Sequence, residues 1–286
     1  MPDYPFAVFR ELRALRDQVA LWRSGGLTVG FVPTMGALHE GHLSLVDLAA
    51  HHADKVVVSI FVNPAQFAPH EDFDDYPRTE DADMEKLSLR PVDGVYLPNR
   101  DAMYPPNFST DVAVGGVSEG LESATRPHFF GGVATVVTKL LNQVQPDIAV
   151  FGEKDYQQLL VIRRLVRDLD MPIEIIGGPT GREADGLAMS SRNAYLTTPQ
   201  RETAGELNKI MRHAIEAIEG GEDAALAVEK AKTALLAAGF NAVQYLELRD
   251  AETLEPLKPN TKSARLLAAV GIGELRLIDN MAVSLP

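Results

Sequence analysis

Residues 27–63 read LTVGFVPTMGALHEGHLSLVDLAAHHADKVVVSIFVN, and this stretch contains the pattern that decides the fold. Two runs rich in Val, Ile and Phe, at 27–34 and 55–63, enclose a run with helical periodicity at 42–52. Nearly continuous apolar strands are typical of a parallel sheet that is buried on both faces. A strand, a helix and a second strand of this kind form the repeating unit of α/β proteins.

The same alternation continues along the chain. Further strands are predicted at 93–98, 147–152 and 172–179, and helices at 131–144 and 155–169. Strands that alternate with helices indicate an α/β fold with a doubly wound, Rossmann-like parallel sheet.

The rhythm of the sequence changes after residue 180. Thr198 and Pro199 give one helix start, a capping residue followed by proline at the first helical position, and Gly239 is the expected C-cap of a second helix. Strand-like runs follow at 242–250, 264–272 and 274–283. The sequence therefore predicts a Rossmann-like domain at 1–180 and a smaller α+β lid domain at 181–286.

Composition and charge narrow the functional classes. The 286 residues are 45% hydrophobic and 23% charged and include no cysteine, so disulfides and thiolate metal sites are excluded. No apolar run approaches the roughly 20 residues that a membrane span needs, and the charged N-terminus does not resemble a signal peptide. We therefore expect a cytoplasmic protein. A net charge of −13 argues against a nucleic-acid partner.

The turn after the first predicted strand has the features of an anion site. Ligands of open α/β sheets bind beyond the carboxyl ends of the strands, beside helix N-termini. Pro33 and Gly36 shape this turn, and His39 and His42 are spaced to point the same way on a helical turn. Gly41 between them leaves room for a flat ring near the backbone. The pattern is neither a Walker A loop nor a dinucleotide glycine fingerprint.

Two other interpretations of this turn remain open. The histidines could simply cap the turn while the glycines shape it. They could also bind zinc with a nearby glutamate, although no third ligand is obvious in the sequence.

Further polar clusters lie at strand ends or at the domain junction, and they are Asn63 with Gln66, Lys154 with Asp155 and Gln158, and Ser190 with Ser191 and Arg192. Each also has a purely structural interpretation. Gln66 could be a loop amide, Asp155 a helix cap, and the two serines a turn that caps a short helix. Four clusters on one edge of a sheet nevertheless favour a binding site.

Several of these segments resemble known signatures. His39 to His42 resembles the His-x-Gly-His element of nucleotidylyl transferases and class I aminoacyl-tRNA synthetases, and MSSRN at 189–193 resembles their second, lysine-serine-rich signature. The ordered set PTMGALHEGH, VNPAQF, YPRT, FGEKDYQQL, DGLAMSSRN and LRLIDN is similar to the pantothenate synthetase (pantoate–β-alanine ligase) family over essentially the whole chain. One departure is RPHFFGGV at 126–133. Here Phe129 takes the place of the family's histidine, His128 comes one position earlier, and Arg126 still matches.

The resemblance implies an ATP-dependent ligation in two steps. The pantoate carboxylate attacks the α-phosphate to give pantoyl-adenylate and pyrophosphate, and the amine of β-alanine then releases AMP to form pantothenate. It also implies Mg²⁺ with the ATP, and a homodimer.

The resemblance further implies the roles of individual residues. The catalytic residues are His42, His39 and Lys154. The implied ATP-binding residues are Met35, Gly36, Ala37, Leu38, His39, Glu40, Gly41, His42, Gly152, Glu153, Lys154, Asp155, Gly181, Met189, Ser190, Ser191 and Arg192. The implied pantoate and β-alanine residues are Gln66, Gln158, Pro33, Asn63 and Arg126. Asp83, at the end of an acidic run that we otherwise expect to be solvated, is implied as a Mg²⁺ ligand.

Three other functions remain as alternatives. A different adenylyl or cytidylyl transferase would act on a phosphorylated acceptor, for which Arg or Lys suits better than the Gln66 and Gln158 pair. An aminoacyl-tRNA synthetase would need a tRNA-binding region, which this acidic chain lacks. A regulator would bind ATP without releasing pyrophosphate.

Overall fold

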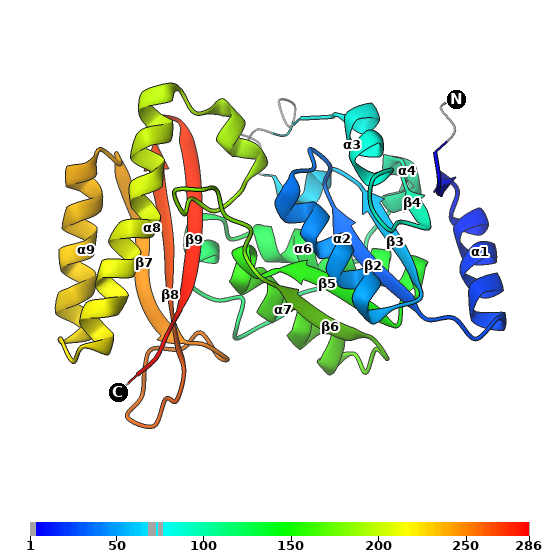
Figure 1. Ribbon diagram of the computed structural model, residues 1–286. Coiled ribbons are helices and arrows are strands. Elements are labelled where there is room, and N and C mark those ends of the chain that lie inside the picture. Colours follow the sequence, from blue (N-terminus) through cyan, green and yellow to red (C-terminus); the bar gives the residue numbers. More distant parts are fainter. Residues whose placement is uncertain (1–3, 68–72, 74–76, 286) are drawn as a thin grey trace. The chain divides into compact units, whose positions relative to one another are not determined.

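The computed structural model describes residues 4–67, 73 and 77–285, and these form two compact units (Figure 1). The first unit contains the residues up to 153 together with 158–179, and the second contains 154–157 together with the chain from 180 onward. Residues 154–157 therefore belong to the second unit, although the sequence predicts them in the first domain.

The first unit is built on a six-stranded sheet with the strand order β1-β4-β3-β2-β5-β6, in which every paired strand is parallel. Its strands are β1 (Ala7–Phe9), β2 (Val29–Thr34), β3 (Lys55–Ile60), β4 (Gly94–Tyr96), β5 (Ile148–Gly152) and β6 (Glu174–Gly178). The predicted parallel α/β sheet is confirmed, and the three-residue edge strand β1 is an addition that its sequence was too short to reveal.

Helices cover both faces of this sheet (Figure 1). The helices that lie wholly or mostly in this unit are α1 (Leu12–Ser24), α2 (Glu40–His52), α3 (Glu80–Leu87), α4 (Arg100–Met103), α5 (Glu122–Thr125), α6 (Phe129–Val144) and α7 (Tyr156–Asp168). Two neighbouring glycines of β6 show which faces α2 and α7 cover. A Cβ on Gly178 would lie 2.2 Å from Leu45 of α2, and one on Gly177 would lie 3.0 Å from Leu159 of α7. Because successive residues of a strand face opposite sides, α2 and α7 cover opposite faces.

The strand order places a topological switch point between β2 and β5. From β2 the chain continues to β3 and β4 on one side, and it then returns to β5 and β6 on the other side. In open α/β sheets the crevice outside the carboxyl ends at such a point is the usual ligand site. Thr34 ends β2 and Gly152 ends β5, so the residues that follow them lie at the expected position.

The second unit packs two helices on an antiparallel sheet of order β7-β8-β9. Its elements are η3 (Ser191–Tyr195), α8 (Thr198–Glu219), α9 (Ala224–Ala238), β7 (Ala242–Asp250), β8 (Ala264–Ile272) and β9 (Leu275–Val283). Leu207 and Met211 of α8 are buried in one core with Leu266 and Val270 of β8. The predicted α+β unit is therefore confirmed.

The helix ends of this unit agree with the sequence to within one residue. Gly239 ends α9 in the left-handed conformation with φ of 109°. The cap of α8 is Thr197 rather than Thr198, because Thr197 N–H donates to Gln200 Oε1 at 2.9 Å. Among the described residues, every helix is too short or too polar to cross a membrane.

Candidate active site

The turn between β2 and α2 has an unusual backbone that a single carboxylate stabilises. Gly36 and Ala37 have positive φ angles of 84° and 50°. Asp83 of α3 accepts from both following amides, with Oδ2 2.9 Å from Ala37 N and Oδ1 2.7 Å from Leu38 N. A positive φ is costly for alanine, so these two charge-assisted hydrogen bonds offset the strain that holds the turn in shape.

These contacts give Asp83 a structural role in the turn, while its expected role in holding Mg²⁺ stays a prediction. The residue is fully buried, and Thr79 Oγ1 donates to the same carboxylate at 3.1 Å. Lys86, one turn further along α3, donates to the carbonyl of Leu38 at 2.6 Å. Among the described residues no group of three or more histidines and carboxylates could hold a metal. Asp83 therefore acts on the shape of the turn.

The two histidines of the turn contact each other at the start of α2. His39 precedes the first helical residue, and the two ring centroids lie 4.0 Å apart. The backbone N–H of His39 donates to His42 Nδ1 at 3.4 Å. A ring nitrogen can accept only without a proton, so neutral His42 carries its proton on Nε2. The turn thus uses Nδ1 of His42 for capping, and Nε2–H is the donor group of the neutral ring.

The other predicted ATP-binding residues of the histidine turn are half-buried or have structural roles. The side chain of Leu38 is buried, so only its backbone can reach a ligand. Glu40 forms an ion pair with Arg90 at 2.8 Å on the exposed start of α2. Met35 and Gly41 are half-buried beside the histidines in sequence.

The polar residues after β3 form a fixed hydrogen-bond network. Asn63 is almost fully buried, its Oδ1 accepts from Ala65 N at 3.3 Å, and its Nδ2 donates to Gly132 O at 3.1 Å. Because both partners are backbone groups of known polarity, they define which way the Asn63 amide points. Asn63 Nδ2 also donates to Gln66 Oε1 at 3.0 Å. Gln66 consequently uses its oxygen inside the network, and its N–H groups donate to none of the residues that the structure describes.

Tyr104 extends this network, although no pattern in the sequence points to it. Its hydroxyl donates to Asn63 Oδ1 at 2.7 Å. Burial raises the pKa of Tyr104 to about 12, so the hydroxyl remains a donor at physiological pH. The N-terminal turn of α6 reaches this network closely, because a Cβ on Gly132 would lie only 2.2 Å from Ala65 O.

Arg126 supports the same network through the backbone of Gln66. Its guanidinium pairs with Glu122 at 2.9 Å, donates to the carbonyl of Gln66 at 3.0 Å and lies 4.1 Å from the ring centroid of Phe129. Phe129, at the position of the family's histidine, therefore has a defined role as the surface on which Arg126 stacks. These contacts make Arg126 a support for Gln66.

The remaining predicted residues of the first unit lie at the ends of their strands. Pro33 is half-buried near the end of β2, opposite Ser59 of β3, and Gly152 and Glu153 follow one another at the end of β5. Gln158 is half-buried in the first turns of α7. With the described part of the chain it makes no hydrogen bond, so its amide is available to a ligand.

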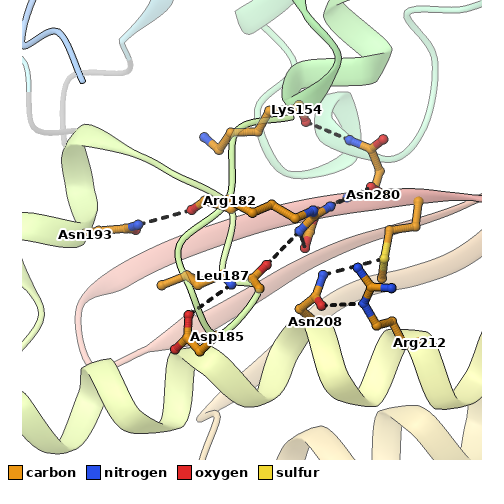
Figure 2. Close-up of polar contacts among 12 residues, drawn as sticks. Lys154, Arg182, Asp185, Leu187, Asn193, Asn208, Arg212 and Asn280 are labelled. Carbon is orange, nitrogen blue, oxygen red and sulfur yellow. Dashed lines mark hydrogen bonds and ion pairs between the residues drawn. The ribbon is translucent and has the colours of Figure 1, made fainter. Parts of the chain in front are cut away.

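In the second unit, Lys154 and Asp155 lie in the 3-10 turn η2 (Glu153–Asp155). Figure 2 shows the carbonyl of Lys154 accepting from Asn280 Nδ2, at 2.8 Å. The Lys154 ammonium forms no ion pair with any residue that the structure describes. A flexible cation with a fixed backbone is suited to meeting an anion.

The serine-arginine segment of the second unit follows a tight hairpin. Met189 N donates to Gly181 O at 2.9 Å and so closes the hairpin. Ser190 Oγ then accepts from Arg192 N at 3.3 Å at the start of η3. Ser190 therefore caps a short helix, as its structural interpretation expected, while Ser191 and Arg192 lie half-buried in that helix.

The structure thus assembles the predicted residues into separate groups. Within the first unit His39 contacts His42, and Asn63, Gln66 and Arg126 form one network. Within the second unit Lys154 and the 181–193 segment are both hydrogen-bonded to β9. Sequence reasoning missed the residues that support these groups, and they are Lys86, Tyr104, Glu122, Arg182, Asp279 and Asn280.

Known proteins are similar to this chain in sequence and in fold. A model of the pantoate-beta-alanine ligase family matches residues 7–282. The pantothenate synthetase of Caulobacter vibrioides is 56% identical over 279 residues, which cover 96% of this chain and 98% of that protein. The pantothenate synthetase of Maricaulis maris is 57% identical, with 96% of each chain covered.

Solved structures agree with the sequence relatives. The pantothenate synthetase of Thermus thermophilus matches with a TM-score of 0.90 at 44% identity and covers 96% of this chain and 99% of that chain. The pantoate-beta-alanine ligase of Francisella tularensis, complexed with beta-gamma ATP and beta-alanine, matches with a TM-score of 0.81 at 33% identity and covers 96% of this chain and 97% of that chain.

Proposed function

The chain belongs to the pantoate–β-alanine ligase family, and from this premise we propose that it joins the two substrates through a pantoyl-adenylate made from ATP. In the first step a carboxylate oxygen of pantoate bonds to the α-phosphorus, and the bond from that phosphorus to the bridging oxygen breaks to release pyrophosphate. In the second step the amine nitrogen of β-alanine bonds to the acyl carbon. The bond from that carbon to the AMP oxygen breaks, and the nitrogen loses a proton.

The phosphates are the proposed ligands of the histidine turn. Because His39 N donates to His42 Nδ1, the neutral ring of His42 has its proton on Nε2. This Nε2–H donates to the α-phosphate as negative charge develops on it. His39 and the amides at the start of α2 add further donors, because a helix N-terminus favours an anion.

The second unit is the proposed source of the charges that neutralise the leaving pyrophosphate. Lys154 supplies a compact cation, and Ser191 and Arg192 supply donors from η3. Gly181 and Met189 close the hairpin that leads to them. In this proposal the second unit is the lid of the ATP site, and its closure excludes water from the reactive anhydride.

Pantoate is the proposed ligand of the Asn63 network. The Gln66 amide turns its N–H groups toward a ligand, so it recognises an acceptor such as a carboxylate or hydroxyl oxygen. Gln158 supplies a second neutral amide. A shorter acid without the hydroxyls of pantoate would leave such a buried amide unpaired, at a cost of about 1–3 kcal/mol.

Mg²⁺ enters this proposal with ATP as the substrate MgATP. The described residues include no cluster of metal ligands, and Asp83 is occupied by the turn. Mg²⁺ usually keeps several waters and binds through phosphate oxygens, so a protein cage is not required. From the family we also expect a homodimer in the cytoplasm.

The observation that supports the acid half of this proposal most directly is the fixed direction of the Gln66 amide. A neutral donor suits an unphosphorylated acid, whereas a transferase for a phosphorylated acceptor would need a cation there. A screen of small acids for ATP–pyrophosphate exchange tests this assignment. We expect exchange with pantoate and little with phosphorylated acids. ATP binding without exchange for any acid would instead support a nucleotide-binding regulator.

A further inference from the structure

The segment LRLIDN at 275–280 has no role in the proposed function, yet its last two residues are among the most buried polar residues that the structure describes. Asp279 and Asn280 lie next to each other in β9, and each is 3% exposed. Burying two polar side chains is costly unless hydrogen bonds satisfy them. Their hydrogen-bond partners therefore indicate why they lie there.

Asp279 holds the hairpin that precedes the serine-arginine segment. Its two carboxylate oxygens accept from Arg182 Nη1 at 2.8 Å and Nη2 at 2.9 Å. Arg182 Nη1 also donates to the carbonyl of Gly186, across the hairpin, at 2.9 Å. A bidentate arginine-carboxylate pair fixes geometry in addition to charge. The pair thus fixes the position of the 181–193 segment relative to β9.

Asn280 holds the turn of Lys154. Its Nδ2 donates to the Lys154 carbonyl at 2.8 Å, and its backbone N–H donates to Asp279 Oδ1 at 2.7 Å. Tyr156 supports the same turn, because its hydroxyl donates to the carbonyl of Ala251 at 2.9 Å and Arg265 lies 3.7 Å from its ring centroid. One dipeptide of β9 is therefore hydrogen-bonded to both segments.

We propose that Asp279 and Asn280 are positioning residues that fix the spacing between the Lys154 ammonium and the Ser191–Arg192 donors. This inference rests on the proposed function, because it assigns both segments to the phosphates of ATP. Lysine and arginine side chains are long and flexible, so their value in the transition state depends on where their backbones are held. A displacement of about 1 Å can cost roughly a hundredfold in rate.

A double-mutant cycle on pyrophosphate exchange tests the Asn280 contact. Asn280→Ala removes the donor to the Lys154 carbonyl, and we expect kcat to fall about tenfold, the size of one hydrogen bond. Lys154→Ala keeps that carbonyl but removes the ammonium. If Asn280 acts through the ammonium, Asn280→Ala adds little further loss of kcat in the Lys154→Ala background. Equal losses in both backgrounds would show a structural role alone and overturn the proposal.

Asn208→Ala is the matched control. Asn208 is an equally buried asparagine of the same unit, but it donates to Met281 Sδ. It also accepts from Arg212 Nε, as Figure 2 shows. We expect this variant to lower the melting temperature about as much as Asn280→Ala does, with kcat close to that of the wild type. An equal kcat loss in Asn208→Ala would overturn the proposal.

The Asp279 contact is tested in the same way, with Asp279→Asn in wild-type and Arg192→Ala backgrounds. Asparagine keeps one acceptor for Arg182 but loses the bidentate ion pair, and the effect on kcat should shrink when Arg192 is absent. Independent effects would contradict the role of Asp279. If the wild type catalyses no exchange, the proposed function fails. The two cycles are then measured on the Kd for MgATP, where the same non-additivity is expected and its absence overturns the inference.

Discussion

Asp83 and Leu38 are 45 positions apart in the sequence, and the Asp83 carboxylate accepts from the Leu38 amide at 2.7 Å. Together with the hydrogen bond to Ala37, this contact holds the backbone from which His39 and His42 project. Helix α3 therefore acts on the histidine turn from a distance in sequence.

Asp83→Asn tests this relationship. An amide can accept from only one of the two turn N–H groups, and its own NH₂ would oppose the other. We expect the free energy of unfolding to fall by about 1–3 kcal/mol in urea denaturation, with a loss of kcat and no change in the Mg²⁺ concentration that gives half-maximal rate. Asp81→Asn, at an exposed position of the same helix, should behave like the wild type. A selective rise in the Mg²⁺ requirement of Asp83→Asn would instead support Asp83 as a metal ligand.

Tyr104→Phe removes one hydroxyl from the Asn63 network. Asn63 keeps its backbone partners, but it loses the hydroxyl donor that helps to orient it toward Gln66. We expect the KM for pantoate to rise about three- to tenfold with the KM for ATP unchanged, because one neutral hydrogen bond contributes about 0.5–1.5 kcal/mol. Steady-state kinetics with each substrate varied in turn distinguishes this result from a general loss of activity.

The pH dependence of the same variant has a definite sign. The pKa of Tyr104 is raised to about 12, so its neutral form is favoured by folding, and the hydroxyl keeps its proton up to that pH. The contribution of Tyr104 to stability is complete below its unfolded pKa of about 10 and is lost as pH rises through about 12. The ratio of the pantoate KM values of Tyr104→Phe and wild type should therefore stay constant from about pH 7 to 10. A ratio that fell to one near pH 10 would mean that the hydroxyl ionises in its usual range.

Gln66→Glu tests the direction of the Gln66 amide. Glutamate can still accept from Asn63 Nδ2, but it turns an oxygen toward the ligand where glutamine turns its NH₂. That oxygen would repel a carboxylate, so we expect Gln66→Glu to raise the KM for pantoate more than Gln66→Ala does. Similar effects of the two substitutions would show that the outward N–H groups do not bind the acid.

Substitutions of His42 can separate the roles of its two ring nitrogens. His42→Asn can keep an acceptor near Nδ1 for the His39 amide, whereas it has no donor at the place of Nε2. We expect melting close to that of the wild type and a kcat lower by about 10²–10³ at saturating ATP, the usual cost of losing one oxyanion donor. His42→Ala should lose both stability and kcat. A near-normal kcat in His42→Asn would limit His42 to capping.

The strands other than β1, the order of the domains and the histidine turn could be predicted from the sequence because they depend on local pattern. Continuous apolar runs mark buried parallel strands, and the turn residues 33–42 include their own glycines and histidines. The burial of Asp83 in α3 could not be predicted, since the composition of its surroundings indicates a solvated acidic run. Its burial depends on the turn that folds against it and not on its neighbours in sequence.

The supporting residues could not be predicted for the same reason. Nothing around Tyr104 in sequence indicates that its hydroxyl meets Asn63, 41 positions away, or that Asn280 meets Lys154 across 126 positions. From the sequence, Phe129 is only the position at which the family's histidine is missing. The structure shows that its ring is the surface on which Arg126 stacks. Such contacts are products of tertiary folding.

The central claim is that the acid is activated as an adenylate before the amine takes part. The measurement that tests it most directly is exchange of labelled pyrophosphate into ATP by enzyme, Mg²⁺ and pantoate with β-alanine absent. We predict exchange under these conditions, no exchange without pantoate, and conversion of the trapped intermediate to pantothenate and AMP when β-alanine is added. Exchange that strictly required β-alanine would contradict the claim, and a concerted reaction of all three substrates would then replace the two-step mechanism.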